Sequence, residues 1–292
     1  MAPLVSILIN NYNYEQFIGE AIESCLSQTY GNIEILVIDD GSRDNSPEIA
    51  RRYPQVTLIQ HPTNKGLAAA RNTAMCSARN EFVASVDADV VADPNWIATL
   101  IPHLNDPKVA GAGGFLLEGM QDTIADRWRC ARMSQEWGPN FVRNPKFLYG
   151  CNNLFRKSAV LGVGGYDESF RTNGEDPDLG RRLHAQGWNL IYDPAARATH
   201  LRHDSVKSIL EMYWRWWKFG NNTYANGVQL RSVLGNALMV HFRYNFLEPA
   251  AADIKHGRLD LLAMDLLALG YMPFRDLRLW IESKRSLTPQ QS

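Results

Sequence analysis

The sequence is poor in cysteine and has almost no excess of charge. Its 292 residues include only four cysteines, Cys25, Cys76, Cys130 and Cys151, and none has the C-x-x-C spacing of redox or zinc motifs. We therefore expect reduced thiols in a cytoplasmic protein rather than a disulfide framework. The formal net charge of −1 gives no electrostatic reason to expect nucleic acid as a partner.

The sequence also lacks a long hydrophobic run. The longest apolar stretches near the C-terminus, residues 261–264 and 266–274, are separated by Asp265 and are too short to span a bilayer. The N-terminal residues lead directly into a strand pattern, without the basic region and cleavage site of a signal peptide. We expect a globular protein with a sizeable core, either free in the cytoplasm or in peripheral contact with the inner membrane face.

What the sequence has instead is a regular alternation of strand and helix patterns. Short apolar runs rich in β-branched residues predict strands at 4–9, 33–38, 56–60 and 82–86. Apolar residues at helical spacing predict helices at 15–28, 46–52, 66–78 and 94–105. This spacing predicts right-handed crossovers and a mostly parallel central sheet flanked by helices. Ligands of such sheets bind at the carboxyl ends of the strands.

Polar residues follow three of these strands, in the segments 11–13, 39–40 and 87–89. The last one begins and ends with Asp, and side chains two residues apart on an extended chain point to the same side. Two carboxylates that converge repel each other unless a cation lies between them, so Asp87 and Asp89 are candidate ligands of Mg²⁺ or Mn²⁺. The alternative is an ordinary surface turn.

The second half of the chain is less regular. Strand patterns are expected at 109–117, 149–155 and 188–192, and helices at 123–137, at 157–163 and after Glu175-Asp176. From about residue 205 the composition shifts towards aromatic residues and helix. We therefore expect one α/β domain over residues 1–204 and a helical region over residues 205–292.

Six motifs occur in a fixed order between residues 4 and 204. They are residues 6–13, 37–44 (Val-Ile-Asp-Asp-Gly-Ser-Arg-Asp), 64–72 (with Asn-Lys-Gly and Ala-Arg-Asn), 87–89 (Asp-Ala-Asp), 164–167 (Gly-Gly-Tyr-Asp) and 175–183 (Glu-Asp-Pro-Asp-Leu-Gly-Arg-Arg-Leu). In this pattern the chain resembles the family 2 glycosyltransferases, inverting enzymes with the Rossmann-like GT-A fold. The resemblance implies a nucleotide-binding half, residues 1–105, and an acceptor half with the catalytic base, residues 106–204.

The resemblance also implies which residues meet the donor, a nucleoside-diphosphate sugar. These nucleotide-sugar contacts are Asn11, Tyr12, Asn13, Asp39, Lys65, Arg71, Asp87 and Ala88. Tyr12 can stack on a base, Asp39 can accept a base N–H, and the two cations can face the diphosphate. UDP-, GDP- and dTDP-linked sugars all remain open, and helix-surface positions are the alternative for the two cations.

By the same resemblance, Asp89 and Asp87 hold Mn²⁺ or Mg²⁺, and His200 is a further metal ligand, unless it is an ordinary buried histidine. The ion would bind the diphosphate and offset the charge of the leaving group. Asp176 is the expected catalytic base, with Glu175 holding the acceptor or the geometry. The alternative for this acidic pair is the capping of a helix N-terminus, where negative charge is favoured.

The sequence departs from parts of the family pattern. The first motif has Asn10-Asn11 where relatives carry Pro-Thr, which makes Asn11 less secure than Tyr12. The Gln-x-x-Arg-Trp motif of processive members is absent, so we expect transfer of a single sugar to a saccharide or lipid-linked acceptor in glycan biosynthesis. A nucleotidyltransferase would need a glycine-rich cationic loop that residues 10–14 lack, and a non-catalytic nucleotide-sugar-binding module is the third hypothesis.

Two C-terminal features have no motif. Residues 213–218 (Tyr-Trp-Arg-Trp-Trp-Lys) either pack a helix on a core or contact sugar rings and phosphate. Residues 258–280 alternate apolar runs with charges and suit an amphipathic helical subdomain. That subdomain either packs and forms a homodimer, or docks on the inner membrane face.

Overall fold

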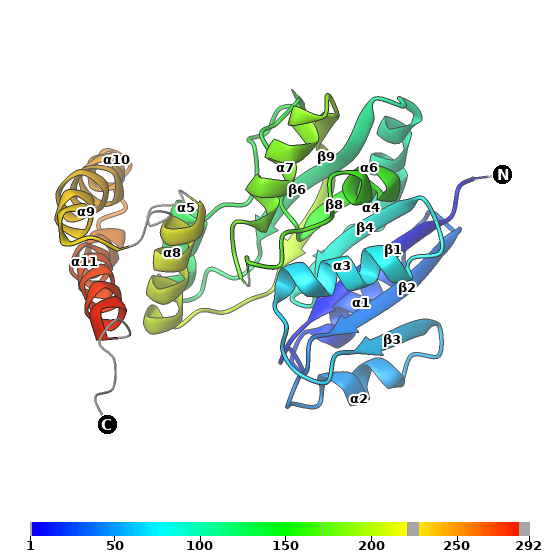
Figure 1. Ribbon diagram of the computed structural model, residues 1–292, viewed down its shortest axis with the longest axis horizontal. Helices are drawn as coiled ribbons and strands as arrows, with labels where there is room; N and C mark the ends of the chain where they lie inside the picture. Colours follow the sequence, from blue (N-terminus) through cyan, green and yellow to red (C-terminus); the bar gives the residue numbers. More distant parts are fainter. Residues whose placement is uncertain (1, 171, 221–227, 286–292) are drawn as a thin grey trace. The chain divides into compact units, whose positions relative to one another are not determined.

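The structure, a computed structural model, describes residues 2–170, 172–220 and 228–285. Its strands are β1 (Val5–Asn11), β2 (Ile33–Asp39), β3 (Val56–Gln60), β4 (Phe82–Asp87), β5 (Val90–Ala92), β6 (Val109–Glu118), β7 (Val142–Arg143), β8 (Asn152–Arg156) and β9 (Asn189–His200). They form one nine-stranded sheet in the order β3-β2-β1-β4-β8-β6-β9-β5, with β7 paired to β9. Figure 1 shows the strands from β3 to β4 side by side.

The sheet is mixed, with a parallel portion that carries the motifs at residues 6–13, 37–44 and 87–89. Strands β3, β2, β1 and β4 are parallel neighbours, and β6 is parallel to β9. Strands β8, β5 and β7 join by antiparallel pairing. The α/β fold with a mostly parallel central sheet is confirmed, and the carboxyl ends of β1, β2 and β4 lie at one edge.

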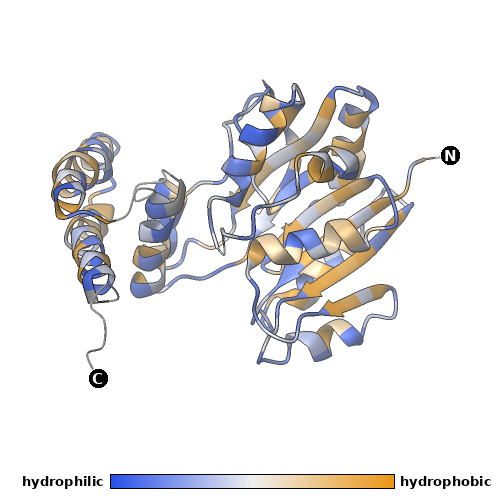
Figure 2. Ribbon diagram, in the orientation of Figure 1, coloured by the Kyte–Doolittle hydropathy of each residue, from blue (hydrophilic) through white to orange (hydrophobic). Residues whose placement is uncertain are grey.

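Helices cover both faces of this sheet. They are α1 (Ile18–Leu26), α2 (Ser46–Arg51), α3 (Leu67–Ser77), α4 (Trp96–Leu100), α6 (Lys157–Gly162) and α7 (Glu175–Ala185). In β1 the alternation of side chains places Val5, Ile7 and Ile9 in a core with α1 and α4, and Leu8 in a second core with α3, α6 and α7. Most residues of the central strands are hydrophobic (Figure 2), and every residue of β1 is buried, as expected of strands covered on both faces.

Three elements differ from their predicted bounds. The helix expected over 94–105 is α4 followed by a 3-10 helix, Ile101–Asn105, because Pro102 has no N–H for an α-helical bond. The helix expected over 123–137 ends earlier, as α5 (Ile124–Arg132). The strand expected over 188–192 continues as β9 to His200, which brings that histidine into the sheet.

The chain divides into two compact units, each described here by itself. The first contains residues 1–119 and 134–202 and holds the sheet, whereas the second contains residues 120–133 and 203–292. Membership of 120–133 in the second unit was not anticipated, and the domain boundary at residue 204 stays a prediction. Part of the region 205–292, residues 221–227 and 286–292, lies outside the described residues.

The second unit is helical and has its own core. Besides α5 it contains α8 (Val206–Gly220), α9 (Leu230–Gly235), the π-helix η2 (Asn236–Leu247), α10 (Glu248–Lys255) and α11 (Leu261–Arg285). Trp128 of α5 packs edge-on against Tyr213 of α8 in this core, which supports the packing interpretation of the aromatic run at 213–218. In the described part of the chain, none of the helices combines the length and the hydropathy needed to cross a membrane.

Candidate active site

The ends of β1 and β2 form one hydrogen-bonded edge. The buried Asn11 side chain donates to Asp39 Oδ1 over 2.7 Å and to Ser42 Oγ over 3.2 Å. Asp39 is completely buried and also accepts from Gln60 Nε2 at 3.3 Å. The two residues expected to meet the base are thus brought into direct contact, and Asn11 orients the Asp39 carboxylate.

The other residues expected on the nucleotide are more exposed. Tyr12 is 42% exposed, so its ring is accessible for stacking. Asn13 is exposed with a positive φ of 58°, and its Oδ1 accepts from Arg43 N–H. The Lys65 side chain is exposed, while its backbone N–H donates to Asp40 at 2.9 Å. Asp40 also contacts His61 Nδ1 at 2.7 Å, so its carboxylate is engaged within the protein.

The end of β4 separates the two aspartates of the Asp-Ala-Asp motif. Asp87 accepts from Asn10 Nδ2 at 3.2 Å and lies 3.8 Å from Arg71 Nη2. Ala88 is fully buried and its N–H donates to Asn10 O at 2.9 Å, which fixes the turn. Burial raises the pKa of Asp87, and Arg71 opposes that rise.

Arg71, on α3, is the cation at the centre of the site. Its guanidinium is buried, and Nη1 donates to Glu175 Oε1 and to Asp176 Oδ1, both at 2.8 Å. The Arg71 Cζ atom also lies over the Tyr166 ring, 5.5 Å from the ring centroid. The structure therefore engages Arg71 with carboxylates from β4 and α7, and its expected contact with a diphosphate stays a prediction.

Glu175 and Asp176 form the first turn of α7, where the helix dipole favours negative charge. Asp176 Oδ2 accepts the Gly150 N–H at 2.8 Å. Burial raises the pKa of Asp176 to about 7, a rise that Arg71 opposes and Glu175 reinforces. Within the described residues Glu175 Oε2 is buried without a hydrogen-bond partner, so this acidic pair keeps acceptor capacity.

Gly150 provides a direct test of this arrangement. A Cβ at this position would lie 1.9 Å from Arg71 Nη2, and the guanidinium is held in place by its carboxylates. We expect Gly150→Ala to displace Arg71, to lower the free energy of unfolding by about 1–3 kcal/mol and to reduce turnover. Chemical denaturation and initial rates measure both effects. Gly162→Ala is the matched control, because nothing lies within 4 Å of that Cβ position; equal effects of the two changes would contradict the assignment.

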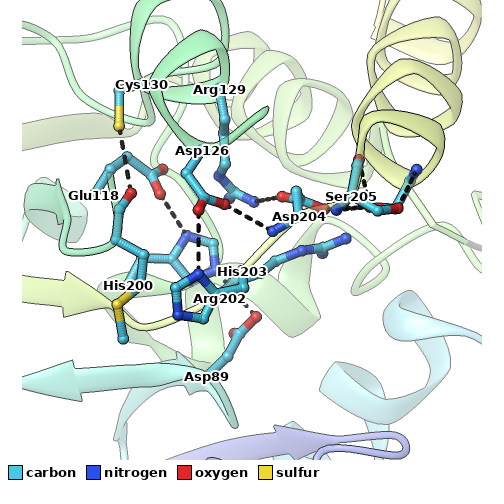
Figure 3. A network of polar contacts seen from close by, with 12 residues as sticks. Asp89, Glu118, Asp126, Arg129, Cys130, His200, Arg202, His203, Asp204 and Ser205 are labelled. Atoms are coloured by element: carbon cyan, nitrogen blue, oxygen red, sulfur yellow. Dashed lines mark hydrogen bonds and ion pairs between the residues drawn. The ribbon is translucent and has the colours of Figure 1, made fainter. Parts of the chain in front are cut away.

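His200 lies between two carboxylates. Its Nε2 is 3.0 Å from Asp89 Oδ2, and its Nδ1 is 3.1 Å from Glu118 Oε2 (Figure 3). All three side chains are buried. The carboxylate on Nδ1 fixes the orientation of the ring, as commonly occurs for metal-ligating histidines. Asp89 and His200 are thus brought together as predicted, while Asp87 turns towards Arg71.

Asp89 Oδ2 and His200 Nε2 are hydrogen-bonded at 3.0 Å. Adjacent ligands of an octahedral ion with bonds of about 2.1 Å also lie about 3.0 Å apart, so the spacing is compatible with both arrangements. In the described part of the chain no cluster of three or more His, Cys, Asp or Glu side chains is arranged to hold a metal by itself. Ions of this kind commonly take one or two protein carboxylates and complete their shell with phosphate and water.

Sequence reasoning missed three residues of the site. Glu118 ends β6, far from any motif, and only the pairing of β6 with β9 brings it to His200. The backbone N–H of Gly150 donates to Asp176, and the side-chain amide of Asn10 donates to Asp87. The position of Asn10 at a strand end, beside the expected nucleotide contacts, was the one available signal.

Comparison with known proteins gives the same family as the motifs. A sequence profile described as Glycosyl transferase family 2 matches residues 6–162, more than half of the chain. The chain is 32% identical over 178 residues to a pre-mycofactocin glycosyltransferase of Mycobacterium tuberculosis, a match that covers 58% of this chain and 37% of that protein. It is 27% identical over 220 residues to a glucosyl-dolichyl phosphate glucuronosyltransferase of Haloferax volcanii, covering 67% and 68% of the two chains.

Solved structures share the fold. The mannosyltransferase PcManGT from Pyrobaculum calidifontis, in complex with GDP-Man and Mn²⁺, superposes with a TM-score of 0.61 at 18% identity, over 95% of this chain and 88% of that chain. TarS residues 1–349 from S. aureus give a TM-score of 0.59 at 14% identity, over 98% and 93% of the two chains. Motifs, fold and profile agree, and the chain belongs to glycosyl transferase family 2.

Proposed function

We propose that the protein is a metal-dependent inverting glycosyltransferase that moves one sugar from a nucleoside-diphosphate sugar to a hydroxyl acceptor. The observation that carries the proposal is the Arg71 cluster. In this cluster Arg71 contacts Asp87, at the end of β4, and the Glu175-Asp176 pair, which contains the candidate base Asp176. Such a link sets the donor side of the site at a fixed position relative to a proton acceptor.

The proposed reaction is a single in-line displacement. Asp176 accepts the proton of the acceptor hydroxyl, and the hydroxyl oxygen bonds to the anomeric carbon. The bond between that carbon and the phosphate oxygen breaks, and its electron pair leaves with the diphosphate. The proton then passes from Asp176 to solvent. Because the attack and the departure are on opposite faces, the anomeric configuration inverts.

Asp39 and Tyr12 would hold the base of the donor, with Asn11 orienting Asp39 and Asn13, Lys65 and Ala88 completing the nucleotide contacts. An ion held by Asp89, His200 and Asp87 would offset charge on the diphosphate as it leaves. Structural neighbours contain Mn²⁺ with GDP-Man or with UDP and GalNAc, so both donor classes are candidates here. The dolichyl phosphate in the name of the archaeal relative makes a lipid-linked acceptor a candidate beside a saccharide.

A donor panel tests the proposal. Thermal unfolding is followed with UDP-, GDP- and dTDP-sugars, each with and without Mn²⁺, and the stabilising donor is then offered to hydroxyl acceptors. A donor at 100 times its Kd adds about 2.7 kcal/mol of stability. Proton NMR of the product reports the anomeric configuration. Retention of configuration, or stabilisation by every donor without Mn²⁺, would overturn the mechanism proposed.

The raised pKa of Asp176 predicts a pH profile. A general base works only when deprotonated, so kcat at saturating donor is expected to rise about tenfold per pH unit below 7 and to level off above about pH 8. The direction follows from the sign of the shift, since a raised pKa keeps the proton on Asp176 to higher pH. Steady-state rates from pH 5.5 to 9 measure it. A flat profile over that range would exclude Asp176 as the base.

A further inference from the structure

Helices α9 and η2 form a continuous segment, Leu230–Leu247, whose outward surface is apolar. Leu234, Leu238 and Met239 are 62%, 66% and 52% exposed. The other large apolar side chains exposed on this segment are Leu230, Phe242, Tyr244 and Leu247. Together with Arg231 and Arg243 these side chains are here named the α9–η2 surface. Exposed apolar side chains gathered on one segment point to an interaction site.

The inward side of the same segment carries two polar side chains beside Val233. His241 and Asn245 are buried, and His241 Nε2 contacts Asp276 Oδ2 at 2.9 Å. Asp276, on α11, thus binds the inward side of the segment through His241, and it also accepts from Trp214 Nε1 at 2.8 Å. Helices of water-exposed proteins bury apolar residues and expose polar ones. Here seven large apolar side chains are exposed while His241 and Asn245 are buried.

The segment also has an uneven charge. Residues 230–247 contain two arginines and no Asp or Glu. Arg231 donates to Gln229, and Arg243 lies 3.9 Å from Glu248 with both side chains exposed, a weak pairing. Three other acids of the helical unit, Asp253, Asp265 and Asp276, are buried. The α9–η2 surface thus presents positive charge beside apolar side chains.

We propose that the α9–η2 surface binds the face of a membrane that contains anionic phospholipid. The apolar side chains would enter the boundary between headgroups and acyl chains, and the arginines would meet lipid phosphates. A second copy of the chain is less suitable, because residues 230–247 offer two arginines and no acid to pair with them across a two-fold contact, and the neighbouring Glu248 already lies beside Arg243. The polar side that carries His241 and Asn245 keeps the segment parallel to the surface rather than surrounded by hydrocarbon.

Vesicle flotation of the full chain tests this proposal independently of any glycosyl transfer. We expect binding to vesicles of phosphatidylcholine and phosphatidylglycerol (7:3) and at least tenfold weaker binding to phosphatidylcholine alone. The double change Leu238→Ser/Phe242→Ser is expected to weaken binding at least tenfold, and Arg231→Gln or Arg243→Gln about fivefold each. The matched control is Leu266→Ser/Leu277→Ser on α11, which removes exposed apolar side chains elsewhere in the unit and is expected to leave binding unchanged.

Direct contact with lipid is measured by a label. In a Cys76→Ser background, which removes an exposed thiol, Leu238→Cys carrying an environment-sensitive fluorophore is expected to shift to shorter wavelength on anionic vesicles. Asp260→Cys, on an exposed polar position, is expected to shift little. Absence of vesicle binding by the wild-type chain at low salt would overturn the proposal. So would equal loss in the α11 control, or a dimer in light scattering that the α9–η2 changes dissociate while vesicles are not bound.

Discussion

Asp176→Asn is expected to lower kcat by about 10²–10⁴-fold while donor binding is retained. The amide keeps the size of the side chain, and its single oxygen can accept from one of the two present donors, Gly150 N–H or Arg71 Nη1. It cannot accept a proton at neutral pH, so the loss is expected in the transfer step. Single-turnover rates with pre-bound donor separate this loss from a change in affinity.

The control for this change lies two residues further along the same helix. Asp178 forms ion pairs with Arg181 and Arg182 at 2.8 and 2.7 Å, so its carboxylate is directed along the surface of α7. Asp178→Asn is therefore expected to leave kcat within about threefold of wild type, because its carboxylate is engaged by two arginines of the same helix, in i,i+3 and i,i+4 pairs of small energy. A large loss at Asp178 with near-normal turnover of Asp176→Asn would move the base to Asp178.

The positions of the strand-end clusters could be predicted from sequence because they follow from periodicity alone. Each polar group after β1, β2 and β4 marks the point where a buried apolar run ends, and parallel pairing brings these points to one edge. The direction of Asp87 and Asp89 could not be predicted in the same way. Side chains two residues apart on a strand point to the same side. Here the chain turns at Ala88, and the two carboxylates contact different partners.

Partners that are distant in the sequence were the least predictable part of the site. Arg71 was expected to face a diphosphate because a cation after a motif suggests a phosphate contact. In the fold, α3 and α7 place it against acids more than a hundred residues away. Glu118 belongs to the same class, since β9 had to extend to His200 before the contact could form. The exposure of the apolar side chains of α9 and η2 also depends on which side faces α11, and composition does not show this.

Asp89→Asn is expected to remove the metal-dependent part of donor binding. The amide still contacts His200, so the buried pair keeps its shape, but a neutral oxygen is a much weaker ligand for a divalent ion than a carboxylate. A donor that adds about 2.7 kcal/mol of stability to the wild type at 100 times its Kd would add about 0.4 kcal/mol if its affinity fell a hundredfold. Thermal unfolding with donor and Mn²⁺ measures this difference.

Asp93→Asn is the matched control, because Asp93 is an exposed acid in the same region whose side chain caps the Asn95 N–H at 2.9 Å. It is expected to leave the Mn²⁺-dependent stabilisation unchanged. If Asp89→Asn also leaves it unchanged, the ion is not held by Asp89, and the contact with His200 is then a buried polar pair of the core. If the stabilisation disappears while the melting temperature without ligand stays within a few degrees, the pair belongs to the donor site. Comparing the two states of one variant thus separates ligand binding from stability, which a loss of activity alone would not do.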